Sequence, residues 1–515
     1  MRYLYALCLC SLLILWSSCR NDFETEPSAG RLSFSKDTVY LDTVFSNIGS
    51  STYNLKVYNR SDDDITIPSV RLAQGENSAY RLNVDGLAGK TFENIDILAN
   101  DSIFIFVETT ADINQLAANA VEFLYTDQIQ FDSGNDQQEV ELVTLIKDAV
   151  FLFPEVIDES TGEIELLQIG EDPDTGEGVF VEGFLLEDDE LIFTNEKPYV
   201  IYGFAAVPPN KTLEVQAGAR VNFHRNSGII VANEGSLHLN GSLSTDPEAL
   251  ENEIIFEGDR LEPAFSEVPG QWYGIWLTAG STDHIINHTT IKNATVSLQM
   301  DSNDGTDDPT LLIQNTQIYN SSLIGLFAQT ANISAENVVI NQAGINSLRI
   351  NFGGTYDFKH CTIANYWNNS FRNTPALFLS DGVPEFSEEL NATFSNCIIY
   401  GNENLELWIE PSGNDTAFNY VFENSLIRFN DFNNQFADNP LYDFDNPSIF
   451  TENVFNELPN FLNAQENKLQ IGLDSFAREI GNPVTTTAVG DDILGVNRTL
   501  PGDAGAYQSI EFIED

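Results

Sequence analysis

The chain has 515 residues, 42% of them hydrophobic and 11% aromatic, which suits two or three domains with large cores. Its 78 acidic and 23 basic residues give a formal net charge of −55, which argues against nucleic acid and anionic lipid as partners, because both attract Lys and Arg. Cations, basic surfaces and neutral polymers remain as partners, and the charge also serves to keep a secreted protein soluble.

The N-terminus is typical of a secretion signal. One Arg precedes an apolar run from Leu4 to Trp16, which is too short to span a membrane. Small residues then lead to Cys19, and this ending resembles the signal of bacterial lipoproteins. The resemblance implies a signal peptide over residues 1–18, a lipid on Cys19 and a tether over 19–30.

Acidic residues follow the cysteine at Asp22, Glu24 and Glu26. They resemble the export tag with which some Gram-negative families place lipoproteins on the outer surface. We therefore expect a lipid-anchored protein of the bacterial outer membrane, exposed at the cell surface, with the lipid as its sole contact with the membrane. The alternative is a secreted protein with an incidental cysteine.

Residues 31–148 predict a β-sandwich. Short segments such as Tyr53–Tyr58 and Ile103–Val107 are rich in β-branched and aromatic residues, and turn signals separate them. The stretch Asn59–Ile67 resembles the strand–turn–strand of bacterial Ig-like spacer domains. This part of the sequence has no His and no Cys, so a spacer or docking role is expected. Residues 149–197, with two Gly-containing turns, are interpreted as a connector.

A short phrase then recurs: Asn or His, two mostly small or apolar residues, and Ile. The marker positions, at which Asn or His stands, are 288, 315, 337, 360, 396 and 424, with steps of 27, 22, 23, 36 and 28 residues. A shortest step of 22 with longer exceptions indicates a repeat of fixed length with loop insertions, which is typical of stacked coils. The Ile three residues after each marker is expected to stack in the core, and the marker to occupy a turn.

The short strands broken by Gly or Asn from Val200 onward resemble the coils of right-handed parallel β-helices of the pectin-lyase-like fold. The resemblance covers 198–456 and implies an all-β protein in which an Ig-like sandwich precedes a β-helix. The segment 457–515 resembles the closing part of bacterial β-helix surface proteins and is expected to cap the last coils, since an open coil end is an unpaired strand edge.

A second strand follows most markers, and its alternation predicts an outward row of side chains at coil spacing. We call it the outward row: Trp276, Gln299, Phe327, Arg349, Phe378 and Trp408. Glu406 is predicted to face outward beside it. Aromatic rings pack on sugar rings, and amides and Arg pair with hydroxyls or carboxylates, so the row predicts a groove for a glycan. The alternative is that long insertions, such as 366–375, simply cover these rings.

Enzymes are common among β-helix proteins. Arg349 is a weak candidate for the base of a polysaccharide lyase, and Glu406 with Glu410 for the paired carboxylates of a glycoside hydrolase. An enzyme should show a charged cluster across neighbouring coils, whereas this face is mostly aromatic and amide, so a non-enzymatic role is favoured and an enzyme remains open. No other catalytic motif is present.

The acidic loop Asp301–Asp308, which follows Gln299 of the outward row, is a candidate calcium site. Asp301, Asn303, Asp304 and Asp307 place oxygen ligands around Gly305, as calcium prefers, although the spacing differs from an EF-hand. A solvated acidic loop is the alternative, so calcium is the single cofactor considered. Cys361 and Cys397 each follow a marker, which leaves a disulfide or two stacked free thiols open, with free thiols favoured.

The sequence thus predicts a cell-surface lipoprotein whose β-helix is a non-enzymatic scaffold that binds a glycan or another surface polymer or protein. A polysaccharide lyase or glycoside hydrolase acting on the outward face is the alternative. The sequence does not identify the ligand.

Overall fold

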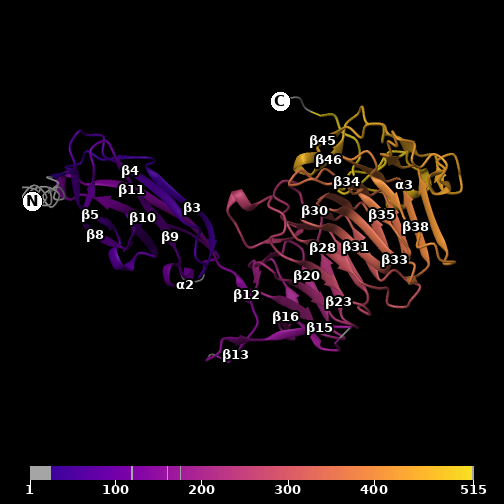
Figure 1. Ribbon diagram of the computed structural model, residues 1–515, viewed down its shortest axis with the longest axis horizontal. Helices are drawn as coiled ribbons and strands as arrows, with labels where there is room; N and C mark the ends of the chain where they lie inside the picture. The colour runs from indigo at the N-terminus through magenta and orange to yellow at the C-terminus, as the bar shows by residue number, and fades with distance from the viewer. Residues whose placement is uncertain (1–24, 118–119, 159, 174, 513–515) are drawn as a thin grey trace, which may run out of the picture. The chain divides into compact units, whose positions relative to one another are not determined.

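A computed structural model describes residues 25–117, 120–158, 160–173 and 175–512, and it is nearly all β (Figure 1). The predicted signal peptide and Cys19 lie outside the described residues. The chain divides into two compact units, one ending at Asp148 and the other beginning at Ala149. No helix of the described residues is long and apolar enough to cross a membrane.

The first unit is a β-sandwich of two sheets around one core. The first sheet contains β1 (Glu26–Pro27), β5 (Ile65–Leu72), β10 (Glu122–Phe131), β11 (Gln138–Lys147) and β3 (Thr38–Phe45), with β8 (Thr91–Ile97) beside β5. The second contains β2 (Ser33–Phe34), β4 (Tyr53–Tyr58), β9 (Ser102–Thr109), β6 (Tyr80–Val84) and β7 (Leu87–Gly89). Alternation along each strand fills the core from both sheets, as Leu55 and Ile67 do. The finer Ig-like assignment stays a prediction.

The described residues of this unit also form short helical turns: α2 (Ile113–Leu116), η1 (Gly75–Asn77) and η2 (Gly134–Asp136). The Asp112 side chain caps α2 by accepting a hydrogen bond from the backbone of Asn114.

The second unit is a parallel β-helix, whose coils stack strand on strand (Figure 1). One sheet, here called the marker sheet, follows the marker positions. Its strands are β12 (Val150–Leu152), β18 (Tyr199–Ile201), β21 (Arg220–Phe223), β24 (Ile254–Gly258), β27 (Thr289–Lys292), β30 (Gln317–Ser321), β32 (Val339–Ala343), β34 (Thr362–Asn365), β39 (Ile398–Gly401), β42 (Leu426–Ile427) and β44 (Val454–Phe455).

The other large sheet holds two further ladders, which join where β31 (Ile324–Glu336) and β33 (Asn346–Lys359) run through both. The ladder with the outward row also contains β16 (Gly178–Leu185), β19 (Phe204–Val207), β22 (Gly228–Val231), β25 (Gly274–Leu277), β28 (Val296–Met300), β35 (Leu377–Leu379) and β40 (Leu407–Ile409). The remaining ladder contains β17 (Ile192–Phe193), β20 (Thr212–Gln216), β23 (Ser236–Asn240), β26 (His284–Asn287), β29 (Leu311–Gln314), β38 (Leu390–Ser395), β41 (Phe418–Glu423) and β43 (Phe450–Thr451).

Hairpins and short helices decorate the coils. The hairpins are β13 (Val156–Asp158) with β14 (Glu163–Ile164), β15 (Leu166–Glu171) with β16, β36 (Gly382–Val383) with β37 (Phe386–Ser387), and β45 (Phe461–Asn463) with β46 (Lys468–Ile471). The helical segments are η3 (Pro263–Phe265), η4 (Pro440–Tyr442), η5 (Ala464–Glu466) and α3 (Pro483–Val489).

The predicted core ladder is confirmed. Its isoleucines pair coil by coil in parallel register and are fully buried: Ile291, Ile318, Ile340, Ile363, Ile399 and Ile427. Every marker has a positive φ, between 45° at His288 and 56° at Asn396, so the turn role is confirmed too. Adjacent amides also bond between coils, as from Asn337 Nδ2 to Asn315 Oδ1 at 3.0 Å. The right hand of the helix stays a prediction.

The β-helix begins earlier than predicted, inside the stretch interpreted as a connector. There β12 pairs in parallel with β18, β16 with β19, and β17 with β20. Residues 149–197 therefore supply a first coil and two hairpins, and the prediction of a connector is wrong. The Gly-containing turns, which suggested a connector, belong to the hairpins on that coil.

The C-terminal residues 457–512, here called the lateral segment, lie along the marker sheet. Leu469 and Tyr507 pack with Val339 and Ala364, and Figure 1 shows β45 and β46 next to β34. An aromatic cluster from 429–455 instead packs against the last coils, with Tyr442 and Phe444 in ring contact. Residues 429–455 thus largely cover the end of the β-helix. The C-terminal segment, which was predicted to cap the last coils, instead covers the side formed by the marker sheet.

Candidate ligand-binding face of the β-helix

The outward row forms one ladder on successive coils. Trp276 pairs with Gln299, Gln299 with Phe327, Phe327 with Arg349, Arg349 with Phe378, and Phe378 with Trp408. All six side chains are partly exposed. Five steps at a strand spacing of ~4.8 Å give a row about 24 Å long. The register predicted from spacing is confirmed, and ligand contact stays a prediction.

The direction of the row follows from strand alternation. Leu326 and Ala328 on either side of Phe327 are fully buried, as are Leu348 and Ile350 on either side of Arg349. With apolar neighbours turned into the core, the intervening side chain must point out.

At the Trp276 end of the row, one carboxylate accepts hydrogen bonds from several side chains. Asp301 accepts hydrogen bonds from Trp276 Nε1 at 2.5 Å, Gln299 Nε2 at 2.8 Å and Gln329 Nε2 at 3.2 Å. Trp276 also packs beside a small apolar cluster that includes Ile230. These contacts orient the indole and both amides.

Arg349 stands in the middle of the row. Its guanidinium lies 4.2 Å from the centroid of the Phe378 ring, and Nη1 donates to Asn346 Oδ1 at 3.1 Å. Partial burial lowers the pKa of Arg349, and the nearby Glu410 acts in the opposite direction. Within the described residues it forms no ion pair, so further N–H donors remain for a ligand.

Trp408 forms the opposite end of the row, nearest the C-terminus. Its Nε1 donates to Glu410 Oε2 at 3.2 Å, and its ring meets Phe436 edge to face, with centroids 5.4 Å apart. Phe378 and Trp408 remain partly exposed despite the insertion 366–375, so the rings are not fully covered.

The prediction that Glu406 faces outward is wrong. Glu406 is fully buried and accepts from Arg372 Nη2 at 2.8 Å and Nη1 at 3.0 Å, and from the backbone nitrogens of Ala376 and Glu403. Burial raises the pKa of Glu406, while Arg372 opposes that rise. Glu406 lies just before β40, where strand alternation does not yet apply. It does not form a solvent-facing catalytic pair with Glu410.

The calcium candidates do not converge on one point. Among the described residues, no group of three or more His, Cys, Asp or Glu side chains is arranged to hold a metal ion. Asp301 is used by the outward row, while Asp304 accepts from Thr282 and Thr306 within and beside its loop. Although partial burial raises the pKa of Asp304, these hydrogen bonds outweigh it and leave the pKa at about 2. Asn303 Oδ1 accepts from the backbone nitrogen of Gly305 in the turn, and the involvement of Asn303 and Asp307 in calcium binding stays a prediction.

Cys361 and Cys397 are free thiols in the core. Their strands are neighbours, since Thr362 pairs with Ile398. Burial raises the pKa of the Cys397 thiol, with Cys361 as the next cause, so the Cys397 thiol stays protonated.

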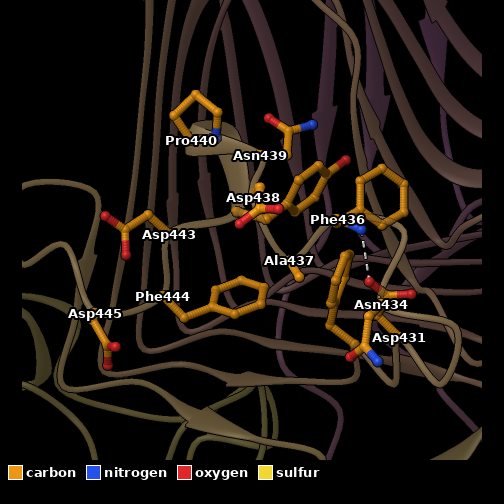
Figure 2. Close-up of a pocket in the computed structure, with 12 residues that line it drawn as sticks. Asp431, Asn434, Phe436, Ala437, Asp438, Asn439, Pro440, Asp443, Phe444 and Asp445 are labelled. Atoms are coloured by element: carbon orange, nitrogen blue, oxygen red, sulfur yellow. Dashed lines mark hydrogen bonds between the residues drawn. The ribbon is translucent and has the colours of Figure 1, made fainter.

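A hollow that the sequence did not reveal lies at the C-terminal end of the β-helix. Its volume is about 580 Å³, and Figure 2 shows aromatic rings among carboxylates. The carboxylates are Asp431, Asp438, Asp443 and Asp445, and the rings include Phe436 and Phe444. Asp431 accepts from the backbone of Phe436 at 2.8 Å, so it orders the loop. Four Asp among Phe and Tyr within 429–445 are the signal that sequence reasoning passed over.

No protein-family model matches the chain, and no curated protein matches it. Among solved structures, it is similar to the ASH/PapD-like domain 7 of human CEP192, at 8% identity and a TM-score of 0.16 over 25% of this chain and 94% of that one. It is also similar to a family 123 glycoside hydrolase from Clostridium perfringens that hydrolyses glycolipid glycans, at 8% identity and a TM-score of 0.15 over 23% of this chain and 26% of the hydrolase. Likenesses this remote do not bear on the function of the chain.

Proposed function

We propose that the protein is a non-enzymatic surface scaffold whose outward row binds a glycan chain. The observation behind the proposal is the in-register row of three kinds of side chain, aromatic, amide and Arg, on six successive coils. Rings stack on the faces of sugar rings, while Gln299 and the spare donors of Arg349 suit hydroxyl or carboxylate oxygens. Because Asp301 orients Trp276 and Gln299 in advance, little side-chain freedom is lost on binding.

The proposal includes the location of the protein. The sequence around Cys19 favours a lipid anchor in the bacterial outer membrane, with the folded units outside the cell. The lipid is then the membrane contact, and the β-helix is presented to polymers at the cell surface.

Binding to a glycan array tests this function. The double variant Phe327→Ala/Phe378→Ala should lose at least about tenfold in affinity for any glycan that the wild type binds, which corresponds to about 1.4 kcal/mol. Leu312→Ala is the matched control, because Leu312 is an exposed apolar residue on another ladder of the β-helix. Equal loss in both variants, or an unchanged double variant, would refute the role of the row.

A polysaccharide lyase remains the second candidate, because Arg349 is a partly buried cation with spare donors. New chain ends released from acidic polysaccharides, and lost in Arg349→Ala, would establish it. Absence of new chain ends together with glycan binding supports the scaffold.

A further inference from the structure

The N-terminal sandwich has an exposed aromatic surface of its own. On β9, Phe104 and Phe106 are 45% and 42% exposed, whereas Ile105 between them is fully buried. Their rings lie nearly parallel, with centroids 6.1 Å apart and planes at 13°. Two large rings held side by side on a rigid strand are not needed for the core, which the alternate residues fill.

The neighbouring strand extends this surface. In the β4–β9 register, Lys56 lies opposite Phe104 and Asn54 lies opposite Phe106. Lys56 Nζ is 5.1 Å from the centroid of Phe104 and 5.4 Å from that of Tyr58. Lys56 is not ion-paired within the part of the chain that the structure describes, so its ammonium group remains a donor.

On the other side of β9, a hollow of about 500 Å³ adjoins Phe106. Asn83, opposite Phe106 in the β6–β9 register, lines it together with Lys90. Arg81 and Glu108 line it as an ion pair, with Nη2 and Oε2 3.2 Å apart. Amide, cation and carboxylate groups therefore lie directly beside the rings.

We propose that the outward face of this sheet, here called the sandwich platform, binds a neutral polysaccharide. The platform consists of the outward side chains of β4, β9 and β6: Asn54, Lys56, Tyr58, Arg81, Asn83, Phe104 and Phe106. The parallel rings of Phe104 and Phe106 take the apolar faces of sugar rings. The surrounding amide, ammonium and carboxylate groups donate to and accept from hydroxyls. This proposal does not depend on the outward row of the β-helix.

Charge argues for a neutral polymer. On the platform Arg81 is paired with Glu108, which leaves Lys56 over the Phe104 ring as the one cation of the platform without a carboxylate partner among the described residues. The net charge of −55 on the whole chain repels polyanions. The exposed large apolar residues on this sheet are Phe104, Phe106 and Leu87, which is little for a stable protein interface of about 800 Å² on each partner. A row of rings among polar groups suits a narrow sugar chain better.

Affinity electrophoresis of the full chain in native gels tests the platform. The gels contain soluble xyloglucan, galactomannan or dextran as neutral polysaccharides, and polygalacturonate as the polyanion. To separate this site from the outward row, all proteins carry the Phe327→Ala/Phe378→Ala background. We expect at least one neutral polysaccharide to retard this background protein, and Phe104→Ala/Phe106→Ala to weaken that binding at least about tenfold.

The matched control is Tyr40→Ala, because Tyr40 is 65% exposed on the other sheet of the sandwich. It should bind as the background protein does, and thermal melting should show that all variants remain folded. The platform is refuted if no neutral polysaccharide retards the background protein, if polygalacturonate retards it more strongly, or if the Phe104/Phe106 change has no more effect than Tyr40→Ala.

Discussion

The β-helix presents two in-register rows on two of its faces, and they have different surroundings. The markers on the marker sheet meet the lateral segment: Arg498 Nη2 donates to Asn337 Oδ1 at 2.7 Å, and the backbone of Asn482 donates to Asn396 Oδ1 at 2.7 Å. Within the described residues, the lateral segment makes no such hydrogen bond to the outward row, and the members of that row stay partly exposed. Regular spacing alone therefore does not distinguish a covered row from an exposed one. Whether a distant segment satisfies the polar groups makes the difference.

The largest expected effect concerns the buried ion pair beside the outward row. Glu406→Ala should destabilise the protein by about 3–5 kcal/mol, because it leaves the Arg372 charge buried without its carboxylate. Glu410→Ala, at an exposed residue just after β40, should change stability by less than about 0.5 kcal/mol. Urea unfolding measures both, and equal effects would show that Glu406 is not a structural residue.

Substitutions at two neighbouring residues of β31, Leu326 and Phe327, distinguish the core from the outward row. Leu326→Ala should cost about 2–5 kcal/mol, since Leu326 is fully buried. Phe327→Ala should cost less than about 1.5 kcal/mol, because Phe327 faces outward and leaves no internal cavity. Comparable losses in thermal or urea unfolding would mean that Phe327 is core rather than surface.

The lateral segment is expected to depend on Arg498. This buried side chain donates to Asn337 Oδ1 and to the backbone oxygens of Gly505 and Ala506. Arg498→Ala should destabilise the protein by about 1.5–3 kcal/mol and expose residues 457–512 to limited proteolysis. Arg478→Ala, near the surface of the same segment, is the control. Unchanged proteolysis would contradict the role of Arg498 in holding the cover.

The last expected effect is a dependence of stability on pH that comes from His360 in the covered row. Burial, with help from Arg498, lowers the pKa of His360 to about 2, against about 6.5 when unfolded. The unfolded chain then binds the proton more readily, so this stability is present above about pH 6.5 and is lost as pH falls toward about 2, by up to about 1.4 kcal/mol for each unit.

His360→Asn should reduce this slope, because Asn occupies the same left-handed turn at Asn396 and does not titrate. Urea unfolding between pH 7 and pH 4 compares the two proteins. If their slopes agree, His360 does not contribute to the acid sensitivity of the covered face.

Several features followed from the sequence because they depend on local geometry. Coil length placed Ile318 on Ile340, and alternation turned Phe327 outward beside Leu326. The tolerance of Asn for positive φ fixed the marker turns, as at Asn315. These relations need no knowledge of distant segments, since each coil repeats the same backbone path.

Other features were decided by the tertiary structure alone. The Arg372–Glu406 pair joins residues 34 apart through the fold of an insertion, and Arg498 reaches Asn337 from 161 residues away. The exposure of the nearly parallel rings of Phe104 and Phe106 depends on the sandwich fold, because the alternate residues of their strand pack into the core between the two sheets. By itself, the sequence determined the repeat, the core ladder and the direction of the outward row. Which row is covered depends on long-range packing, because no local pattern records where the lateral segment will lie.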